Sequence, residues 1–409
     1  MDDDLKNRIH QNLVARRAEQ FEFLRRLVGT PSENPPGDGE AAAELTAGTL
    51  KGLGFAVERH RVPNELAARH GMARITNLVA RSPFGSGNVV ALHASGDTRP
   101  AGEGWTADPF QAAIDNGVMR GLGVLGKADI AAYAYALAAL RDADPDLAGT
   151  VELHVTFDGE TGGELGPLWL MRKGIVNPDY AVASGLAHGI GTATMGDLQM
   201  EVTLEAGEAT GRGRPPDAMA TAGRVIGALY DMNDAFAGIV SSVKGVAGPS
   251  IMVGEIAGGT RPDRRPGRVT FGLVRRMIPD EDPGVAEKSL TRLIAEVASL
   301  EDGIDCRIRR LKLVAPMKPG PGTARLLATL EAQASESAGE AIGSYGVSFD
   351  TPARHYAALG VPTLLYGAGP ATAEEANMGM ADERLRLDDL RLATEVVALT
   401  LARFMAQTA

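Results

Sequence analysis

Residues 89–97 read Val-Val-Ala-Leu-His-Ala-Ser-Gly-Asp, an apolar run that ends in small and polar residues. Residues 151–159, Val-Glu-Leu-His-Val-Thr-Phe-Asp-Gly, repeat this design. Short apolar runs bounded by turn residues are typical of buried strands. Residues 127–140, which lie between the two runs, are apolar and rich in alanine and therefore predict a buried helix. Strands that alternate with helices predict an α/β fold, in which helices sandwich a mostly parallel sheet.

The pattern changes near residue 191, which predicts a second domain. From residue 199 polar and apolar residues alternate, as in a strand with one exposed face. Further elements are expected at 218–231 (helix), 250–256 and 268–276 (strands), 285–298 (helix) and 306–314 (strand). This pattern predicts an α+β unit with one open sheet face, inserted between two halves of the first domain. The predicted boundaries are 1–191, 192–315 and 316–409.

Composition and charge exclude several classes of protein. The 409 residues carry a net charge of −11, which should repel phosphate backbones, so we expect no nucleic-acid partner. No apolar run reaches the roughly 18 residues of a membrane span, so we expect no membrane partner. The acidic start, Met1-Asp2-Asp3-Asp4, is unlike a secretory signal. Cys306 is the only cysteine, which excludes an intrachain disulfide. We expect a cytoplasmic protein.

Four loops combine glycines with polar residues at the ends of apolar runs. They span residues 93–97, 121–127, 158–163 and 366–370. In a parallel sheet, functional side chains come from the loops that follow the carboxyl ends of the strands. The sequence therefore predicts that a functional site lies where these four loops meet.

Several segments resemble the M20 metallopeptidase family, which includes aminoacylases, acetylornithine and succinyl-diaminopimelate deacylases and glutamate carboxypeptidases. The similar segments are Asn77-Leu78-Val79-Ala80, residues 97–110 (Asp-Thr-Arg-Pro-Ala-Gly-Glu-Gly-Trp-Thr-Ala-Asp-Pro-Phe), residues 258–262 (Gly-Gly-Thr-Arg-Pro) and residues 358–363 (Ala-Leu-Gly-Val-Pro-Thr). The resemblance implies a zinc-peptidase-like domain with an inserted, ferredoxin-like lid, through which members of the family often dimerise. It also implies a small substrate that carries a carboxylate, and a homodimer.

The family's chemistry uses two zinc ions, a bridging Asp and a general-base Glu, and the resemblance places small residues at most of these positions. The five replaced positions are Ser95, Gly126, Gly159, Ser184 or Gly185, and Gly379. The lid histidine falls near Thr210 or Gly211. One ligand carboxylate, Glu160, remains. We therefore expect no metal cofactor, and an enlarged pocket that holds a larger ligand or water where the metal ligands are missing.

Glu160, Asp97 and Lys127 are the candidate catalytic residues. A buried lysine ammonium is able to replace part of the missing metal charge, to pair with Glu160 or Asp97, and to move protons. Each residue also has a structural alternative. Glu160 would be a carboxylate paired with a nearby base, Asp97 a loop cap, and Lys127 a residue at the start of a helix or in solvent.

Arg276, Arg354, Asp263 and His93 are the candidate substrate-binding residues. Arg276 corresponds to the family's lid arginine and would meet a substrate carboxylate, unless it forms a salt bridge within the lid. Arg354 also corresponds to a family arginine, and Asp263 takes the position of a substrate-contacting Asn. His93 precedes the first lost ligand on its strand, where a satisfied core histidine is the alternative.

These residues lead to two functional hypotheses. The first is a hydrolase-type enzyme that acts on a small carboxylate-bearing amide, or a related compound, by a mechanism without the standard dinuclear zinc site. The second is a catalytically inactive member of the family that binds a small ligand or a partner.

Overall fold

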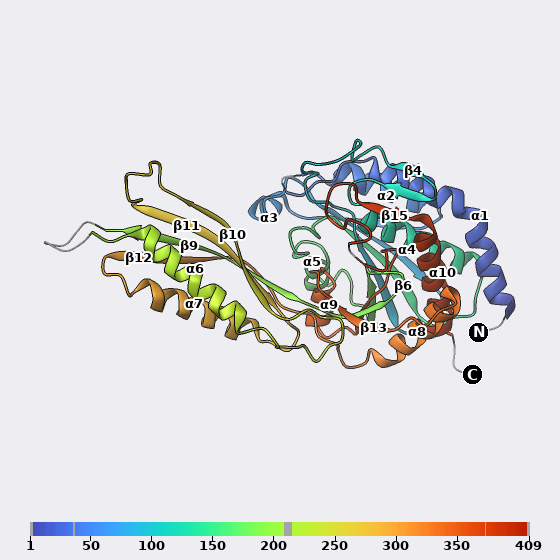
Figure 1. Ribbon diagram of the computed structural model, residues 1–409. Helices are drawn as coiled ribbons and strands as arrows, with labels where there is room; N and C mark the ends of the chain where they lie inside the picture. The colour runs from blue at the N-terminus through green and yellow to red at the C-terminus, as the bar shows by residue number, and fades with distance from the viewer. Residues whose placement is uncertain (1–2, 36, 208–214, 373, 407–409) are drawn as a thin grey trace. The chain divides into compact units, whose positions relative to one another are not determined.

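The computed structural model describes residues 3–35, 37–207, 215–372 and 374–406 (Figure 1). The chain divides into two compact units. The first unit consists of residues 1–192, 319–345 and 351–409, and the second of residues 193–318 and 346–350. The boundaries predicted from the sequence are 191/192 and 315/316. Among the described helices, none is both long and apolar enough to cross a membrane.

The first unit is built on an eight-stranded sheet with the order β1-β2-β6-β3-β7-β14-β8-β13. The strands are β1 (Val57–Arg61), β2 (Thr76–Pro83), β6 (Thr150–Thr156), β3 (Val89–Ser95), β7 (Tyr180–Ala183), β14 (Thr363–Leu365), β8 (Ile190–Thr194) and β13 (Ser344–Val347). The central strands β6, β3, β7 and β14 run parallel, whereas β1–β2, β2–β6 and β14–β8 are antiparallel pairs. The predicted α/β fold with a mostly parallel sheet is confirmed.

Helices cover both faces of this sheet. They are α1 (Asp3–Val28), α2 (Glu40–Gly52), α3 (Asn64–Arg69), α4 (Val124–Asp142), α5 (Pro167–Arg172), α8 (Ala324–Ala338), α9 (Arg354–Ala358) and α10 (Leu387–Phe404). A small sheet, β15 (Arg384–Arg386), β5 (Val118–Arg120) and β4 (Ala113–Asp115), joins the C-terminal segment to the region before α4. In β3, Leu92 belongs to the large core beneath α4, whereas Ala91 contacts Tyr356 of α9 on the opposite face. This alternation explains why the strand is apolar on both sides.

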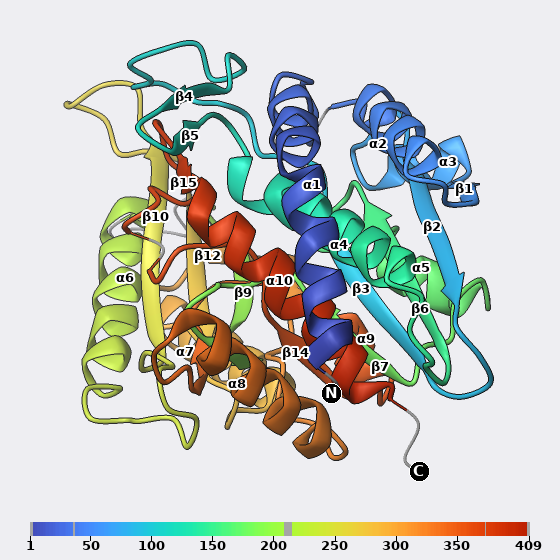
Figure 2. The same ribbon diagram turned by 90° about the vertical axis from the view of Figure 1, so that its right-hand side faces the viewer.

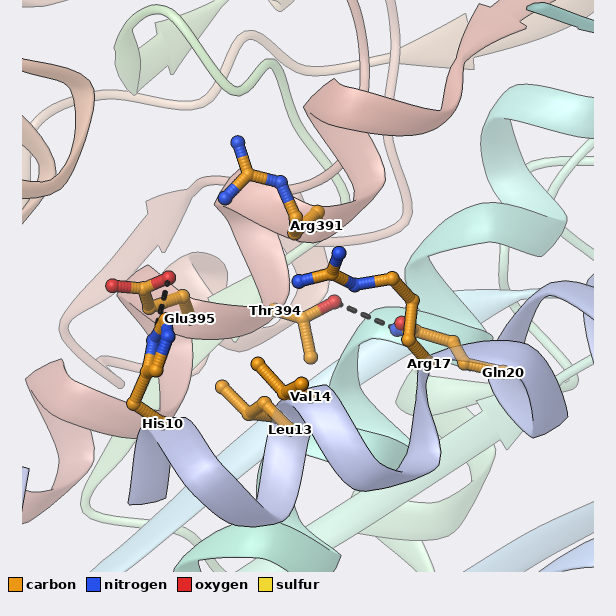
Figure 3. Close-up of a pocket in the computed structure, with 8 residues that line it drawn as sticks. All are labelled: His10, Leu13, Val14, Arg17, Gln20, Arg391, Thr394 and Glu395. Atoms are coloured by element: carbon orange, nitrogen blue, oxygen red, sulfur yellow. Dashed lines mark hydrogen bonds and ion pairs between the residues drawn. The ribbon is translucent and has the colours of Figure 1, made fainter. Parts of the chain in front are cut away.

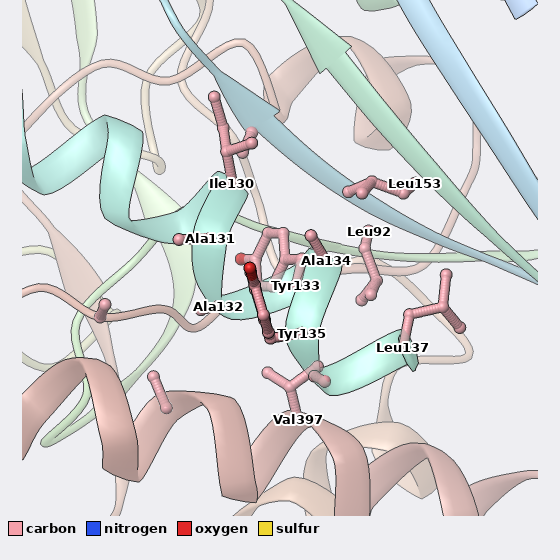
Figure 4. Close-up of a cluster of buried hydrophobic side chains, with 14 of the residues drawn as sticks. Leu92, Ile130, Ala131, Ala132, Tyr133, Ala134, Tyr135, Leu137, Leu153 and Val397 are labelled. Carbon is pink, nitrogen blue, oxygen red and sulfur yellow. The ribbon is translucent and has the colours of Figure 1, made fainter. Parts of the chain in front are cut away.

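The α4 helix is the centre of the core, because nearly all of its length is buried between β3, α1 and α10 (Figures 2 and 4). Its many alanines let these neighbouring elements approach closely. Gln20 of α1 donates hydrogen bonds to Thr394 Oγ1 of α10 at 2.7 Å and to the Ala131 carbonyl of α4 at 3.3 Å. A small pocket between α1 and α10 includes Gln20 and Thr394, but none of the predicted site residues lines it (Figure 3).

The second unit is a four-stranded antiparallel sheet with two helices on one face. The strand order is β10 (Ser250–Gly258), β11 (Arg268–Met277), β9 (Gly196–Ala206) and β12 (Ile304–Val314), and the helices are α6 (Ala218–Asp234) and α7 (Pro283–Ala298). Phe271 and Leu273 of β11 are buried with the helices, whereas the intervening residues of this strand are more exposed. The predicted α+β unit with one open face is therefore present. Its role in dimerisation stays a prediction.

The start of α7 provides a test of local stability in the second unit. Asp282 is the N-cap, and its Oδ1 accepts a hydrogen bond from the Val285 backbone N–H at 2.9 Å. Asp282→Ala should lower the free energy of unfolding by about 1 kcal/mol, because it removes this acceptor from the first turn. Urea denaturation measures the change. Asp282→Asn keeps an oxygen acceptor and should retain most of the stability; equal losses in both variants would contradict the capping role.

Candidate functional site

The site forms where β3 and β6 end side by side. The two strands are parallel, and Ser95 pairs with Thr156 at their carboxyl ends. The loops that follow, 96–99 and 157–163, therefore leave the same edge of the sheet, as expected for a parallel sheet.

Asp97 joins these loops through its buried carboxylate. Its Oδ1 accepts a hydrogen bond from the Gly159 N–H at 2.9 Å, and its Oδ2 accepts from the Glu160 N–H at 3.0 Å and from Asn34 Nδ2 at 3.1 Å. Burial raises the pKa of Asp97 to about 6, against the opposing effect of these donors. This geometry is that of the loop-capping alternative.

Lys127 lies in the first turn of α4 and is almost fully buried, with 1% of its surface exposed. Its Nζ donates a hydrogen bond to the Thr30 carbonyl at 3.0 Å. Burial lowers the pKa of Lys127 to about 8, opposed mainly by the charges of Glu383 and Asp97. Lys127 thus adds a positive charge beside Asp97, but its hydrogen bond goes to a carbonyl and not to the predicted Glu160 or Asp97.

Glu383, which precedes β15, is a buried carboxyl that sequence analysis did not select. Its Oε2 accepts from the Gly123 N–H at 3.2 Å and its Oε1 from the Leu125 N–H at 3.1 Å. A carboxylate at the first turn of a helix is favoured by the unpaired N–H groups there. Burial nevertheless raises the pKa of Glu383 to about 7. In the sequence, Glu383 appears only as part of an acidic pair, Asp382-Glu383. This pair lies far along the chain from α4, the helix whose first turn Glu383 contacts.

Glu160 is paired with Arg99, a second residue that sequence analysis did not select. Arg99 Nε donates to Glu160 Oε2 at 3.2 Å, and the two side chains are 61% and 30% exposed. Glu160 therefore matches the alternative of a carboxylate paired with a base. Arg99 was visible in the run that follows Asp97, but nothing in the sequence indicated its partner.

Neighbouring side chains fill the space at two of the positions where the resemblance replaces a larger residue with glycine. A Cβ atom added at Gly159 would lie 2.7 Å from Ser95 Oγ, so the serine side chain occupies this space. A Cβ atom at Gly379 would lie 3.2 Å from Arg99 Nη1. The expectation of an enlarged pocket is therefore wrong at both positions, because neighbouring side chains occupy the volume.

Gly185 and Gly126 differ in the space that they leave for a side chain. A Cβ atom at Gly185 would lie 2.6 Å from the Tyr366 backbone nitrogen, so the backbone itself leaves no room there. A Cβ atom at Gly126 would meet only the Ser95 carbonyl oxygen, at 3.4 Å, which is an ordinary contact. Among Gly126, Gly159, Gly185 and Gly379, Gly126 is thus the one that retains space for a side chain.

The dinuclear zinc centre that the resemblance implies does not fit the residues present. Within the described part of the chain, no group of three or more His, Cys, Asp and Glu side chains is arranged to hold a metal ion. Zinc sites in proteins use such side chains as ligands. The lid positions, Thr210 and Gly211, lie outside the described residues.

His93 is a core residue of β3. Its Nε2 is 3.1 Å from Thr156 Oγ1, and its ring centroid is 5.6 Å from that of Tyr356. Burial lowers the pKa of His93 to about 3, so the ring is neutral at neutral pH. Because only 1% of its surface is exposed, the geometry favours the core alternative over substrate contact.

Arg354 begins α9 and holds the loop after β6. Its Nη2 donates to the Gly162 carbonyl at 2.5 Å, and its Nη1 donates to the Thr351 carbonyl at 3.2 Å. These contacts place a second basic group against the loop that carries Glu160. The guanidinium is buried, so its visible role is to position the loop.

Arg276 and Asp263 belong to the second unit. Arg276 lies near the end of β11, half-buried, in register with Asp197 of β9 and Ser250 of β10. Asp263 lies in the loop between β10 and β11 and accepts hydrogen bonds from Arg261 at 2.7 and 2.9 Å. Their contact with a substrate stays a prediction.

Comparison with known proteins agrees with this architecture. The model of peptidase family M20/M25/M40 matches residues 91–403. The chain belongs to this family. A succinyl-diaminopimelate desuccinylase of Gluconacetobacter diazotrophicus is 37% identical over 166 residues, which are 39% of this chain and 40% of that protein. This M20 chain thus matches only about two fifths of the length of that curated relative.

Solved structures share the fold of this M20 chain. Human carnosine dipeptidase 1 superposes with a TM-score of 0.75 at 18% identity, covering 98% of this chain and 99% of that one. The M20 family metallo-carboxypeptidase Sso-CP2 of Sulfolobus solfataricus gives a TM-score of 0.76 at 15% identity, covering 95% of this chain and 100% of that one. At these identities the likeness establishes the fold alone.

Removing the Asp97 carboxylate tests how strongly it holds the site together. Asp97→Ala should lower the free energy of unfolding by about 3 kcal/mol, because three donors lose their acceptor in a buried position. Urea denaturation measures the loss. Asp108, an exposed residue that accepts one hydrogen bond from the Phe110 N–H, is the matched control. A loss no larger than that of Asp108→Ala would contradict the loop-joining role.

The buried carboxyls predict a pH dependence of stability. Burial raises the pKa of both Asp129, in α4, and Glu383 to about 7, above their values in the unfolded chain. The folded state therefore retains protons that the unfolded state loses, and this stabilisation disappears as the pH rises through the folded pKa. The free energy of unfolding should fall between about pH 5 and about pH 7.5 in urea denaturation. A flat or rising profile would contradict the shifted pKa values.

Proposed function

We propose that this M20 chain binds a small amide that carries a carboxylate, and that it does so without a dinuclear zinc centre. Family membership supports the class of ligand, since the desuccinylase relative is named for removing succinyl, a carboxylate-bearing acyl group. Because the match covers only about two fifths of that relative, its substrate is not assigned to this chain, and the class of ligand is a proposal.

The observation that carries the proposal is the position of the Arg99 guanidinium. It lies against Gly379, where the family pattern would supply the last histidine ligand, and it pairs with Glu160, the surviving ligand carboxylate. In a zinc centre this carboxylate would face a metal cation. Here a side chain of the protein supplies the opposite charge, which leaves Glu160 satisfied without a metal.

Binding without hydrolysis is the version that the contacts favour. The three predicted proton-transfer groups all have protein partners: Glu160 has Arg99, Lys127 has the Thr30 carbonyl, and Asp97 has three donors. A general base must reach the proton that it takes, within hydrogen-bond distance of the water or substrate. A carboxylate such as Asp97, whose oxygens accept from fixed backbone donors in the interior, is poorly placed for that task.

Hydrolysis without metal is the second candidate, because burial moves the pKa values of two groups of the site towards neutrality. Burial brings the pKa of Asp97 to about 6 and that of Lys127 to about 8. Acids and bases with pKa values close to the working pH are the most effective in proton transfer. In this version Asp97, Lys127 and Glu160 move the protons while water attacks the amide.

Metal analysis combined with a ligand screen separates these functions. We expect purified protein to contain far less zinc than a dinuclear site requires, and to bind N-acyl amino acids or dipeptides in calorimetry equally well before and after treatment with a chelator. Under the main proposal no amine product forms on long incubation, whereas product formed by the chelated protein would support the second candidate. A full pair of tightly bound zinc ions, or binding that requires zinc, would contradict the proposal.

A further inference from the structure

Arg99 and Gly379 form a matched pair across two distant parts of the chain. Gly379 has φ = +69°, a left-handed conformation that disfavours other residues, and its missing side chain leaves room for the guanidinium. A Cβ atom there would lie 3.2 Å from Arg99 Nη1, 3.3 Å from Cζ and 3.6 Å from Nε. The guanidinium therefore lies against the backbone of Gly379, in space that any larger residue would take from it.

The Arg99 guanidinium is hydrogen-bonded through Nε. Nε donates to Glu160 Oε2, whereas Nη1 and Nη2 donate no hydrogen bond to any other residue that the structure describes. The side chain is 61% exposed. Because a guanidinium carries five N–H donors, this arrangement leaves the terminal donors available to an incoming group.

The backbone that carries Arg99 is fixed in place. The neighbouring Thr98 is buried, and its N–H donates to the Ser32 carbonyl at 3.0 Å. The Asn34 N–H donates to the Thr98 carbonyl at 2.7 Å. Together with the Asp97 contacts, these hydrogen bonds fix the backbone at Arg99. A fixed backbone reduces the conformational entropy that is lost when a ligand binds.

We propose that the terminal nitrogens of Arg99 are the carboxylate anchor of the ligand, an inference that rests on the proposed function. The planar guanidinium matches a carboxylate by two parallel N–H···O bonds, and such charge-assisted pairs are stronger than neutral hydrogen bonds. The predicted anchor in the same unit, Arg354, is buried and donates to the Gly162 and Thr351 carbonyls. Arg99 thus combines two functions that are separate in a zinc enzyme: it supplies the positive charge opposite Glu160 and it recognises an anion.

Calorimetry with a charged and an uncharged probe tests this role. The charged probe is N-succinyl-L-alanine, and the uncharged probe is the same compound with both carboxylates converted to carboxamides. Arg99→Ala should weaken binding of the charged probe by about tenfold to a hundredfold, and should leave binding of the uncharged probe unchanged. Arg99→Lys, which keeps the charge but loses the two-pronged geometry, should fall between wild type and Arg99→Ala.

Arg59→Ala is the matched control, because Arg59 lies in the same unit and pairs with Glu44 at 2.8 Å on the surface. It should bind both probes as wild type does. The exposed Arg99–Glu160 pair contributes little to folding, so Arg99→Ala should melt close to wild type. If wild type prefers the charged probe and Arg99→Ala keeps that preference, the anchor is wrong while the proposed function stands. If wild type binds neither probe, both are overturned.

Discussion

The site depends on one buried carboxylate. Asp97 accepts hydrogen bonds from two successive backbone N–H groups of the loop after β6 and from the side chain of Asn34. It thereby joins the loops after β3 and β6 to the segment that follows α1. The position of Glu160 follows from these bonds, since its own N–H is one of the donors. Because Asp97 is buried, water cannot take its place as the acceptor of these three hydrogen bonds. The geometry around Asp97 is therefore constrained.

Opposite charges compensate one another around Asp97. Two cations of the chain, Lys127 and Arg99, lie among carboxyls that would otherwise repel one another. Lys127 is buried and compensates Asp97 and Glu383 electrostatically. Arg99 lies at the surface and pairs with Glu160. Buried carboxyls that lack compensating charge tend to be protonated, and the raised pKa values of Asp97 and Glu383 show that the compensation is partial.

The glycines of the site have different physical roles. The position of Gly159 is tight because Ser95 fills the adjoining space, and Gly379 leaves room for Arg99. Gly126 meets only an ordinary contact. Small residues at these three positions therefore do not form one shared cavity. An empty volume in a protein interior is unfavourable, because the atoms that line it lose dispersion contacts. Side chains that fill such a volume therefore stabilise the folded state.

The α/β fold, the inserted α+β unit and the two loops that carry Asp97 and Glu160 could be predicted from the sequence. These features follow from local patterns: apolar strands, glycine turns and helical periodicity, all read within short windows. Three contacts could not be predicted: Arg99 pairs with Glu160 over Gly379, Glu383 caps α4 and Lys127 donates to Thr30. Each of these contacts joins segments far apart in the chain. Their formation depends on side-chain conformation and on the space left by neighbours, which no local pattern of residues records.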